Sequence, residues 1–258
     1  MARYDFTATR LFVADDLRAD ARVSVADGQA NLLVNVLRLK AGDGLLLFNG
    51  RDGEWRAEII ETRKRAALLR LVERTRAQEG GPDIDYCFAP LKHARLDYVV
   101  QKAVEMGAAR LRPVLTRRTQ VSRLNLDRMR ANAIEAAEQC GILRVPEIAA
   151  ETSLEKMIAA WPADRLLVFC DEGAEIADPI AALRTQSGGV GKAALLIGPE
   201  GGFEEKERAL VLSAPRVLRL SLGPRILRAD TAAVAGMTLV QSVFGDWPGL
   251  ERSDTISP

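Results

Sequence analysis

The sequence has little of what several common enzyme classes need. It contains one histidine, His93, so a metal site with several histidine ligands is impossible and a Ser-His-Asp device would depend on that residue alone. The three cysteines, at positions 87, 140 and 170, are far apart and form no CxxC pair. This spacing indicates neither a disulfide framework nor a zinc site, so we expect no metal and a reducing compartment.

Long apolar runs and a charge excess of one sign are also missing. The N-terminal stretch MARYDFTATRLFV has no apolar core of signal-peptide length, and no segment approaches the length of a membrane span. The formal net charge is only +1, which by itself indicates no class of partner. We therefore expect a soluble, cytoplasmic protein with no membrane partner.

The distribution of charge is more informative than its sum. Residues 92–130 carry ten Lys and Arg against three Asp and Glu, whereas residues 131–258 carry twelve bases against eighteen acids. This asymmetry favours a surface that faces a polyanion, followed by an acidic scaffold. The structural alternative is a solvated helix whose basic side chains point in all directions.

Turn and strand signals predict two domains. Short strand-like runs at 10–13, 36–60 and 66–72, with hairpin turns GDG at 42–44 and NGRDG at 49–53, indicate a small β-barrel over residues 1–74. The polar stretch 75–82, which ends in Gly-Gly-Pro, reads as a linker. Residues 83–248 form the second predicted domain, and 249–258 a frayed tail.

Strands and helices alternate in the second domain, which predicts an α/β fold with a mainly parallel sheet. Strands are expected over 84–90, 110–115, 165–172, 193–198 and 217–223, and helices over 95–107, 126–141, 178–183, from 204, and over 230–245. Three glycine-containing strand ends follow one another, at 168–173, 197–202 and 221–232. Because ligands bind outside the carboxyl ends of parallel strands, these loops can share one pocket.

Two of these loops have unusual chemistry. In LLIGPEGGFEEKE, residues 195–207, a buried strand is followed by a glycine turn and an acid-rich helix start, and Gly201 and Gly202 let main chain approach a ligand closely. A plain strand-to-helix turn explains this segment equally well, and it matches neither GxGxxG nor a phosphate loop. In LGPRILRADTA, residues 222–232, Ile226 and Leu227 are apolar where a surface loop would be polar, and Asp230 or Thr231 could simply cap the next helix.

The pair LLIGPEGGF and LGPRILRADTA resembles the signature of the SPOUT class of S-adenosylmethionine-dependent RNA methyltransferases. More narrowly, it resembles the RsmE family, which makes 3-methyluridine in 16S ribosomal RNA. RLFV, VLRLKAGD, QKAVEMGAARLRPVLTRRTQV and EAAEQCGILRVPEI support the resemblance over almost the whole chain. It implies an α/β fold with a SPOUT-type trefoil-knotted, mainly parallel sheet, preceded by a PUA-like β-barrel, and it implies a homodimer.

The resemblance also implies a reaction, the methylation of uridine N3 in 16S ribosomal RNA on the assembled small subunit. The cofactor S-adenosylmethionine would be bound by Leu196, Ile197, Gly198, Pro199, Glu200, Gly201, Gly202, Leu220, Leu222, Gly223, Ile226 and Leu227. Since the proton on N3 must leave, Arg228 is the candidate cation, and Asp230 and Glu138 are candidate proton acceptors, each of which could instead be a helix cap or ion-pair partner. RNA would contact Arg10, Lys92, Arg117 and Arg118.

The sequence departs from the family pattern at a few positions. Ala229 and Asp230 stand where Thr and Glu are usual, Ile142 replaces an Arg whose loss Arg144 could cover, and His93 stands where Gly is common. These departures place individual contacts in doubt. The alternatives are a SPOUT enzyme that methylates tRNA or a ribose hydroxyl, an RNA-binding assembly protein without methyl transfer, and, without GxGxxG to support it, a nucleotide-dependent oxidoreductase.

Overall fold

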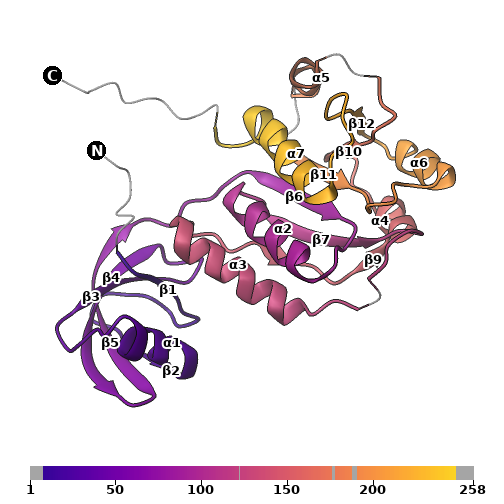
Figure 1. Cartoon of the computed structure of the whole chain (residues 1–258). Helices are drawn as coiled ribbons and strands as arrows, with labels where there is room; N and C mark the ends of the chain where they lie inside the picture. The colour runs from indigo at the N-terminus through magenta and orange to yellow at the C-terminus, as the bar shows by residue number, and fades with distance from the viewer. Residues whose placement is uncertain (1–7, 122, 176–177, 188–190, 248–258) are drawn as a thin grey trace. The chain divides into compact units, whose positions relative to one another are not determined.

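The structure, a computed structural model, describes residues 8–121, 123–175, 178–187 and 191–247. The chain divides into two compact units (Figure 1). Unit 1 holds the residues up to Gly80 together with Ile134–Val145, and unit 2 holds Gly81–Ala133 and the residues from Pro146 onward. Helix α3, Leu126–Cys140, thus contributes to both units, which the sequence did not indicate. The predicted tail at 249–258 lies outside the described residues.

Unit 1 is a five-stranded sheet in the order β1-β3-β4-β5-β2. Its strands are β1 (Arg10–Phe12), β2 (Arg22–Ala26), β3 (Gly44–Phe48), β4 (Glu54–Arg63) and β5 (Ala66–Arg76). Every pairing is antiparallel except that of β1 with β3. Alternation along β2 buries Val23 and Val25 in an apolar core, and Gly50 and Gly53 take positive φ in the turn predicted at 49–53.

One strand expected in unit 1 is absent among the described residues. The run 36–40 was predicted as strand, but α1 (Asp27–Asn31) continues into a π-helical turn, η1 (Leu32–Val36), followed by a loop. The N–H of Leu37 donates to the carbonyl of Leu32, and the N–H of Leu39 to that of Leu33, so this backbone is satisfied locally rather than in a ladder. Val36 and Leu37 are exposed, and Leu39 is the residue of this run that packs against the apolar core, so the strand prediction was wrong.

Unit 2 confirms the predicted parallel sheet. Its seven strands are β6 (Asp83–Phe88), β7 (Arg110–Leu115), β8 (Glu147–Ile148), β9 (Thr152–Ser153), β10 (Leu166–Cys170), β11 (Lys192–Ile197) and β12 (Val217–Leu220). The order is β12-β10-β11-β6-β7-β8, with β9 beside β7, and all pairs are parallel. The helices besides α3 are α2 (His93–Glu105), α4 (Leu154–Ala159), α5 (Pro179–Gln186), α6 (Glu205–Leu212) and α7 (Ala229–Phe244).

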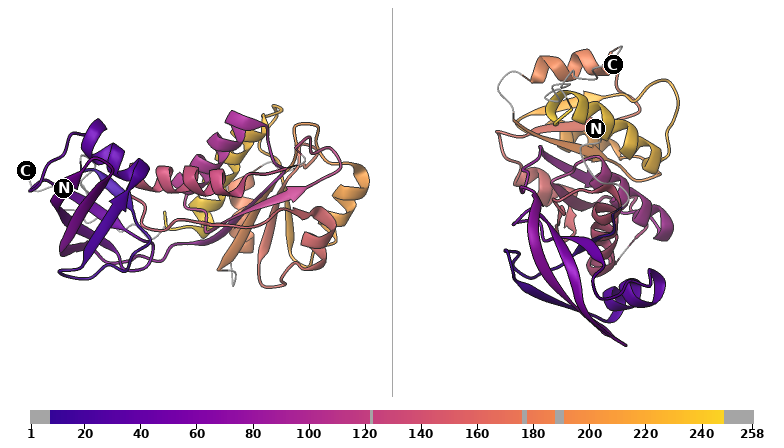
Figure 2. Two further views of the ribbon diagram at one scale, coloured as in Figure 1. Left: turned by 90° about the horizontal axis from the view of Figure 1, so that it is seen from below. Right: turned by 90° about the vertical axis from the view of Figure 1, so that its left-hand side faces the viewer.

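Helices cover both faces of this sheet, which is why β11 is apolar at almost every position. Leu196 packs into a core with residues of α4 and α6. Its neighbour Leu195 faces α7, where a Cβ on Gly236 would lie 2.9 Å from the Leu195 methyl carbons. Helices α2 and α7 pack together on that face (Figure 2). This two-sided packing holds the carboxyl ends of the central strands in place.

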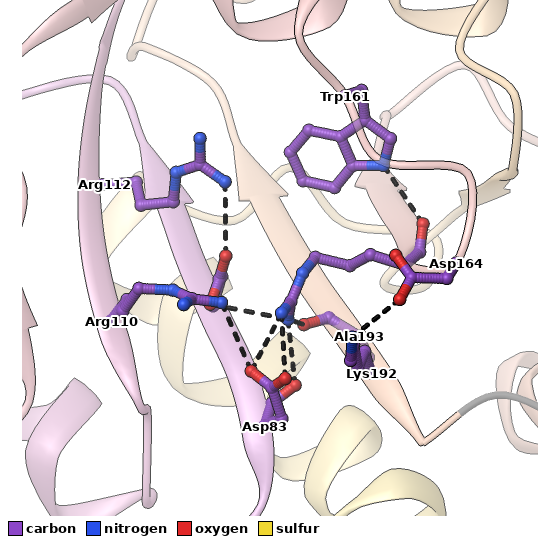
Figure 3. Close-up of polar contacts among 9 residues, drawn as sticks. Asp83, Arg110, Arg112, Trp161, Asp164, Lys192 and Ala193 are labelled. Atoms are coloured by element: carbon purple, nitrogen blue, oxygen red, sulfur yellow. Dashed lines mark hydrogen bonds and ion pairs between the residues drawn. The ribbon is translucent and has the colours of Figure 1, made fainter.

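An ionic cluster holds the opposite, amino-terminal edge of the sheet (Figure 3). The fully buried carboxylate of Asp85 pairs with Arg110 at 2.8 Å, Arg112 at 3.2 Å and Arg165 at 3.5 Å. Arg165 also donates to the carbonyl of Ala193 in β11 and forms a salt bridge with Asp83. The cluster therefore links β6, β7 and β11 to the start of β10.

The sequence analysis did not predict the short elements β2, α1, α4, β8 and β9. The two residues each of β8 and β9 are too few to show a period, whereas β2 has the alternation of a strand and was missed. The trefoil knot stays a prediction. No helix among the described residues combines the length and apolarity needed to cross a membrane.

Candidate functional site

Three loops of unit 2 meet at one edge of the sheet. Strands β12, β10 and β11 are adjacent and parallel, so the loops that follow them leave from the same side. A cavity of about 840 Å³ lies between these loops. Its lining residues are Cys170–Glu172, Ala174, Glu175, Ile197–Phe203, Ser221–Ala229 and Ala232. The predicted convergence of the three strand ends is confirmed.

The loop after β11 owes its shape to its glycines. A Cβ on Gly198 would lie 2.4 Å from a carbon of the Phe203 ring, so only glycine leaves room for the ring to fold over the end of β11. Gly202 has a φ of +69° and its N–H donates to the carbonyl of Pro199. Helix α6 then begins with a capping box formed by Glu204 and Glu207. The predicted order of strand, glycine turn and helix is confirmed.

The loop after β12 presents main chain and apolar side chains. Gly223 has a φ of +105°, and the side chain of Ile226 is 93% exposed. Within the described part of the protein, the N–H groups of Leu222, Ile226 and Leu227 donate to no protein acceptor. This loop therefore offers free backbone donors beside apolar surface, which suits a flat ligand with polar edges.

The loop after β10 supplies an acidic wall. The carboxylate of Asp171 is fully buried and pairs with Arg208 and Arg219, while Glu172 is more than half exposed. Burial raises the pKa of Asp171, but hydrogen bonds from the Gly173 N–H, Arg219 and Arg208 outweigh it, so the pKa lies below its ordinary value. Asp171 is therefore a carboxylate at neutral pH.

Cys170 ends β10 and also lines the cavity. Burial raises the pKa of its thiol to about 12, followed by a smaller effect of the Asp171 charge. The thiol is therefore protonated at neutral pH and is a poor nucleophile. Covalent catalysis through this cysteine is not supported.

Two exposed arginines contact the loop after β11. Arg95 in α2 forms an ion pair with Glu200, and Arg118 donates from Nη1 to the carbonyl of Gly201 at 2.6 Å. Arg117 next to it donates its backbone N–H to Glu207, the residue that closes the capping box. The basic segment found in the sequence thus reaches the rim of the cavity.

The structure brings most of the predicted cofactor residues together. All of them line the cavity except Leu196 and Leu220, whose side chains are fully buried in β11 and β12. Arg228 lines the cavity at the N-cap of α7. Asp230 is not part of the lining. Its carboxylate accepts the N–H of Thr231 in the first turn of α7, whereas the side chain of the N-cap residue Arg228 makes no capping hydrogen bond.

The remaining predicted residues divide into exposed and buried ones. Lys92, Arg117 and Arg118 are exposed in unit 2. Arg10 lies in unit 1 with a side chain that is only 2% exposed and pairs with Glu54 at 2.8 Å, so its guanidinium is not at the surface. Glu138 also belongs to unit 1, where it accepts the N–H of Phe12, and burial raises its pKa.

Sequence reasoning missed several lining residues, chiefly the acids of the loop after β10 and Phe203. The acids of the loop after β10 could have been found, because the sequence analysis placed the strand end at 168–173 in the pocket. The sequence of this segment did not, however, distinguish an acid that lines the cavity from one that is solvated. Phe203 follows GPEGG directly, yet only the structure shows that its ring occupies the space above Gly198.

Comparison with known proteins decides the family. A family model described as an RNA methyltransferase domain matches residues 79–241. The chain belongs to this RNA methyltransferase family. A second model, an RNA methyltransferase PUA domain, matches residues 17–72 and identifies the N-terminal domain.

Relatives from other bacteria support this. The "Ribosomal RNA small subunit methyltransferase E" of Rickettsia conorii is 29% identical over 233 residues, covering 90% of this methyltransferase and 94% of the relative. That of Synechocystis is 29% identical over 240 residues, covering 92% of this chain and 78% of the relative.

Solved structures agree in fold. The small subunit methyltransferase E of Neisseria gonorrhoeae, bound to S-adenosylmethionine, superposes with a TM-score of 0.82 at 24% identity, over 93% of this chain and 99% of that one. A Legionella pneumophila methyltransferase, also with bound S-adenosylmethionine, has a TM-score of 0.78 at 26% identity, with the same coverage.

Proposed function

We propose that this protein transfers a methyl group from S-adenosylmethionine to N3 of a specific uridine in 16S ribosomal RNA, on the assembled small subunit. The observation that carries the proposal is the cavity where three strand ends meet, in a chain of the RNA methyltransferase family. Relatives that are small-subunit ribosomal RNA methyltransferases, and a solved relative with bound S-adenosylmethionine, support the choice of substrate and cofactor.

The residues of the cavity fit this cofactor. The volume of about 840 Å³ lies within the usual range of small-molecule sites, roughly 300–1,000 Å³. Free N–H groups at Leu222, Ile226 and Leu227 suit the polar edges of adenine and ribose, and their apolar side chains suit its faces. Glu172, Glu175 and Glu200 put negative charge on the cavity lining, which would attract the sulfonium and the ammonium of the cofactor.

The chemistry leaves the protein two tasks. S-adenosylmethionine, when bound, supplies a methyl group already activated on sulfur. The protein must therefore align the base and remove the proton from N3. Arg228, exposed at the N-cap of α7 and part of the cavity lining, is proposed to stabilise negative charge on the uracil oxygens as that proton leaves. Asp230, in the first turn of α7 and two residues after Arg228 in the sequence, is one candidate acceptor of the N3 proton. Glu138 is the other candidate.

The exposed basic residues Lys92, Arg117 and Arg118 are proposed to bind RNA phosphates. Such contacts fix the position of the RNA and make affinity depend on salt, while the target base must leave its stack to reach the cavity.

We also propose a homodimer, supported by the side chain of Ile226, which is 93% exposed beside the cavity. Sedimentation at micromolar concentration that gives a mass near 28.2 kDa would contradict the dimer.

The kinetics of Arg228→Ala test the chemistry. With S-adenosylmethionine saturating, we expect kcat to fall by more than tenfold, about 1.4 kcal/mol of transition-state stabilisation, while the dissociation constant for the cofactor stays within threefold. Arg184→Ala, an exposed arginine of α5 outside the cavity lining, is the control. A smaller loss would show that Arg228 is not central.

A further inference from the structure

One guanidinium outside the cavity lining joins two of the three loops. Arg208 lies in α6, and its side chain is 17% exposed. Its Nη1 pairs with Asp171, its Nη2 donates to Glu172 Oε1 at 2.6 Å, and its Nε donates to the carbonyl of Phe203 at 3.4 Å. A single planar fork from α6 therefore contacts the loop after β10 and the loop after β11.

The third loop is connected through Asp171. Arg219 of β12 donates from Nε to Asp171 Oδ2 at 2.7 Å, and the Asp171 N–H donates to the carbonyl of Leu220, the last residue of β12. Asp171 is fully buried, so its charge must be balanced by these two arginines. The strand that leads into the loop at 221–228 is thus held by the same carboxylate that Arg208 holds.

Glu172 connects Arg208 to the glycine turn at Gly202. A Cβ added at Gly202 would lie 3.1 Å from Glu172 Oε1, so this carboxylate lies directly against the turn. Both Glu172 and Gly202 line the cavity. Without Arg208, Glu172 would lose the donor that places it there, and Asp171 would keep only Arg219 as its charge partner.

We propose that Arg208 is a positioning residue for the cofactor: through Asp171 and Glu172 it sets the spacing of the three loops that bind S-adenosylmethionine. The inference rests on the proposed function, since it takes S-adenosylmethionine as the ligand of the cavity. Its geometry requires an arginine, because a lysine is a point charge and cannot bridge two carboxylates and a carbonyl as a planar fork does.

The test is calorimetric titration with S-adenosylmethionine of wild type, Arg208→Met, Arg208→Lys and Lys192→Met. The control residue Lys192 forms an exposed ion pair with Asp164 at 2.6 Å, at the amino-terminal end of β11 (Figure 3). We expect the dissociation constant to rise at least tenfold in Arg208→Met and at least threefold in Arg208→Lys, and to stay within twofold in Lys192→Met. Thermal unfolding of each variant shows whether it is folded at the titration temperature.

Steady-state kinetics distinguish positioning from general loss of structure. KM for S-adenosylmethionine should rise in Arg208→Lys, with kcat at saturating cofactor within threefold of wild type and KM for RNA unchanged. If Arg208→Met does not fold, Arg208→Lys decides the matter. Wild-type affinity in a folded Arg208 variant overturns the inference and leaves the proposed function standing. Failure of the wild type to bind S-adenosylmethionine overturns both.

Discussion

Replacing Gly198 by alanine tests the packing that shapes the cavity. The new methyl carbon would lie 2.4 Å from one carbon of the Phe203 ring and 2.9 and 3.0 Å from two others, whereas ordinary contacts begin near 3.4 Å. The ring must therefore move by about 1 Å, yet it is 5% exposed and packs edge-on against Phe169 at 5.1 Å between centroids. Overpacking of this kind costs about 1–3 kcal/mol.

We expect the free energy of unfolding of Gly198→Ala, measured by urea denaturation, to fall by that amount, and affinity for S-adenosylmethionine to fall with it because Phe203 lines the cavity. Gly191→Ala is the matched control, since a Cβ there meets nothing within 4 Å. In a Phe203→Leu background the cost of Gly198→Ala should drop below about 1 kcal/mol, because the clashing ring is gone. If the free energy of unfolding of Gly198→Ala falls by less than about 0.5 kcal/mol relative to wild type, the steric reasoning is refuted.

Other predictions concern charge. Burial raises the pKa of Glu138 above its ordinary 4.5, so the ionised carboxylate disfavours folding at neutral pH, and this penalty disappears as pH falls below the unfolded-state pKa. Glu138→Gln keeps an oxygen that can accept the Phe12 N–H, so this variant should have a higher urea midpoint than wild type at neutral pH and the same midpoint near pH 4. A large loss of kcat in this variant would instead favour Glu138 as the acceptor of the N3 proton. Asp85→Asn should cost about 3–5 kcal/mol of unfolding free energy because the cluster loses its buried carboxylate and Arg112 its ion pair, although Arg110 and Arg165 keep Asp83; a cost below about 1 kcal/mol would contradict the buried cluster. In RNA binding, Lys92→Ala should reduce the slope of log K against log salt by about 0.7–0.9, whereas Arg10→Ala should leave the slope unchanged and lower stability; an unchanged slope for Lys92→Ala would remove that phosphate contact.

Strand ends were predictable because a buried parallel strand has a strong local signal. The apolar run at 193–198 between glycines locates β11 within a residue, and the rule for carboxyl ends of parallel strands placed its loop beside those of β10 and β12. The prediction for the run 36–40 failed because a short apolar run also suits a loop after a helical turn, where Val36 and Leu37 are exposed and Leu39 packs against the core. Local pattern cannot separate these cases.

Side-chain environment was less predictable than backbone. Arg10 looked like a surface base near the start of the chain, but its partner Glu54 is 44 residues away and the pair is buried. The role of Arg208 depends on partners 36 and 37 residues away in sequence, Glu172 and Asp171. Contacts over such separations follow from topology rather than from spacing, so a single sequence does not reveal them.

Methyl transfer to uridine N3 is tested by incubating the purified protein and isotope-labelled S-adenosylmethionine with small ribosomal subunits that lack the modification, and in parallel with free 16S ribosomal RNA and with tRNA. The labelled nucleoside is then identified by mass spectrometry. We expect label in 3-methyluridine from the small subunits. Label in another nucleoside or in tRNA would contradict the proposed substrate, and no label from a protein that binds the cofactor would contradict methyl transfer itself.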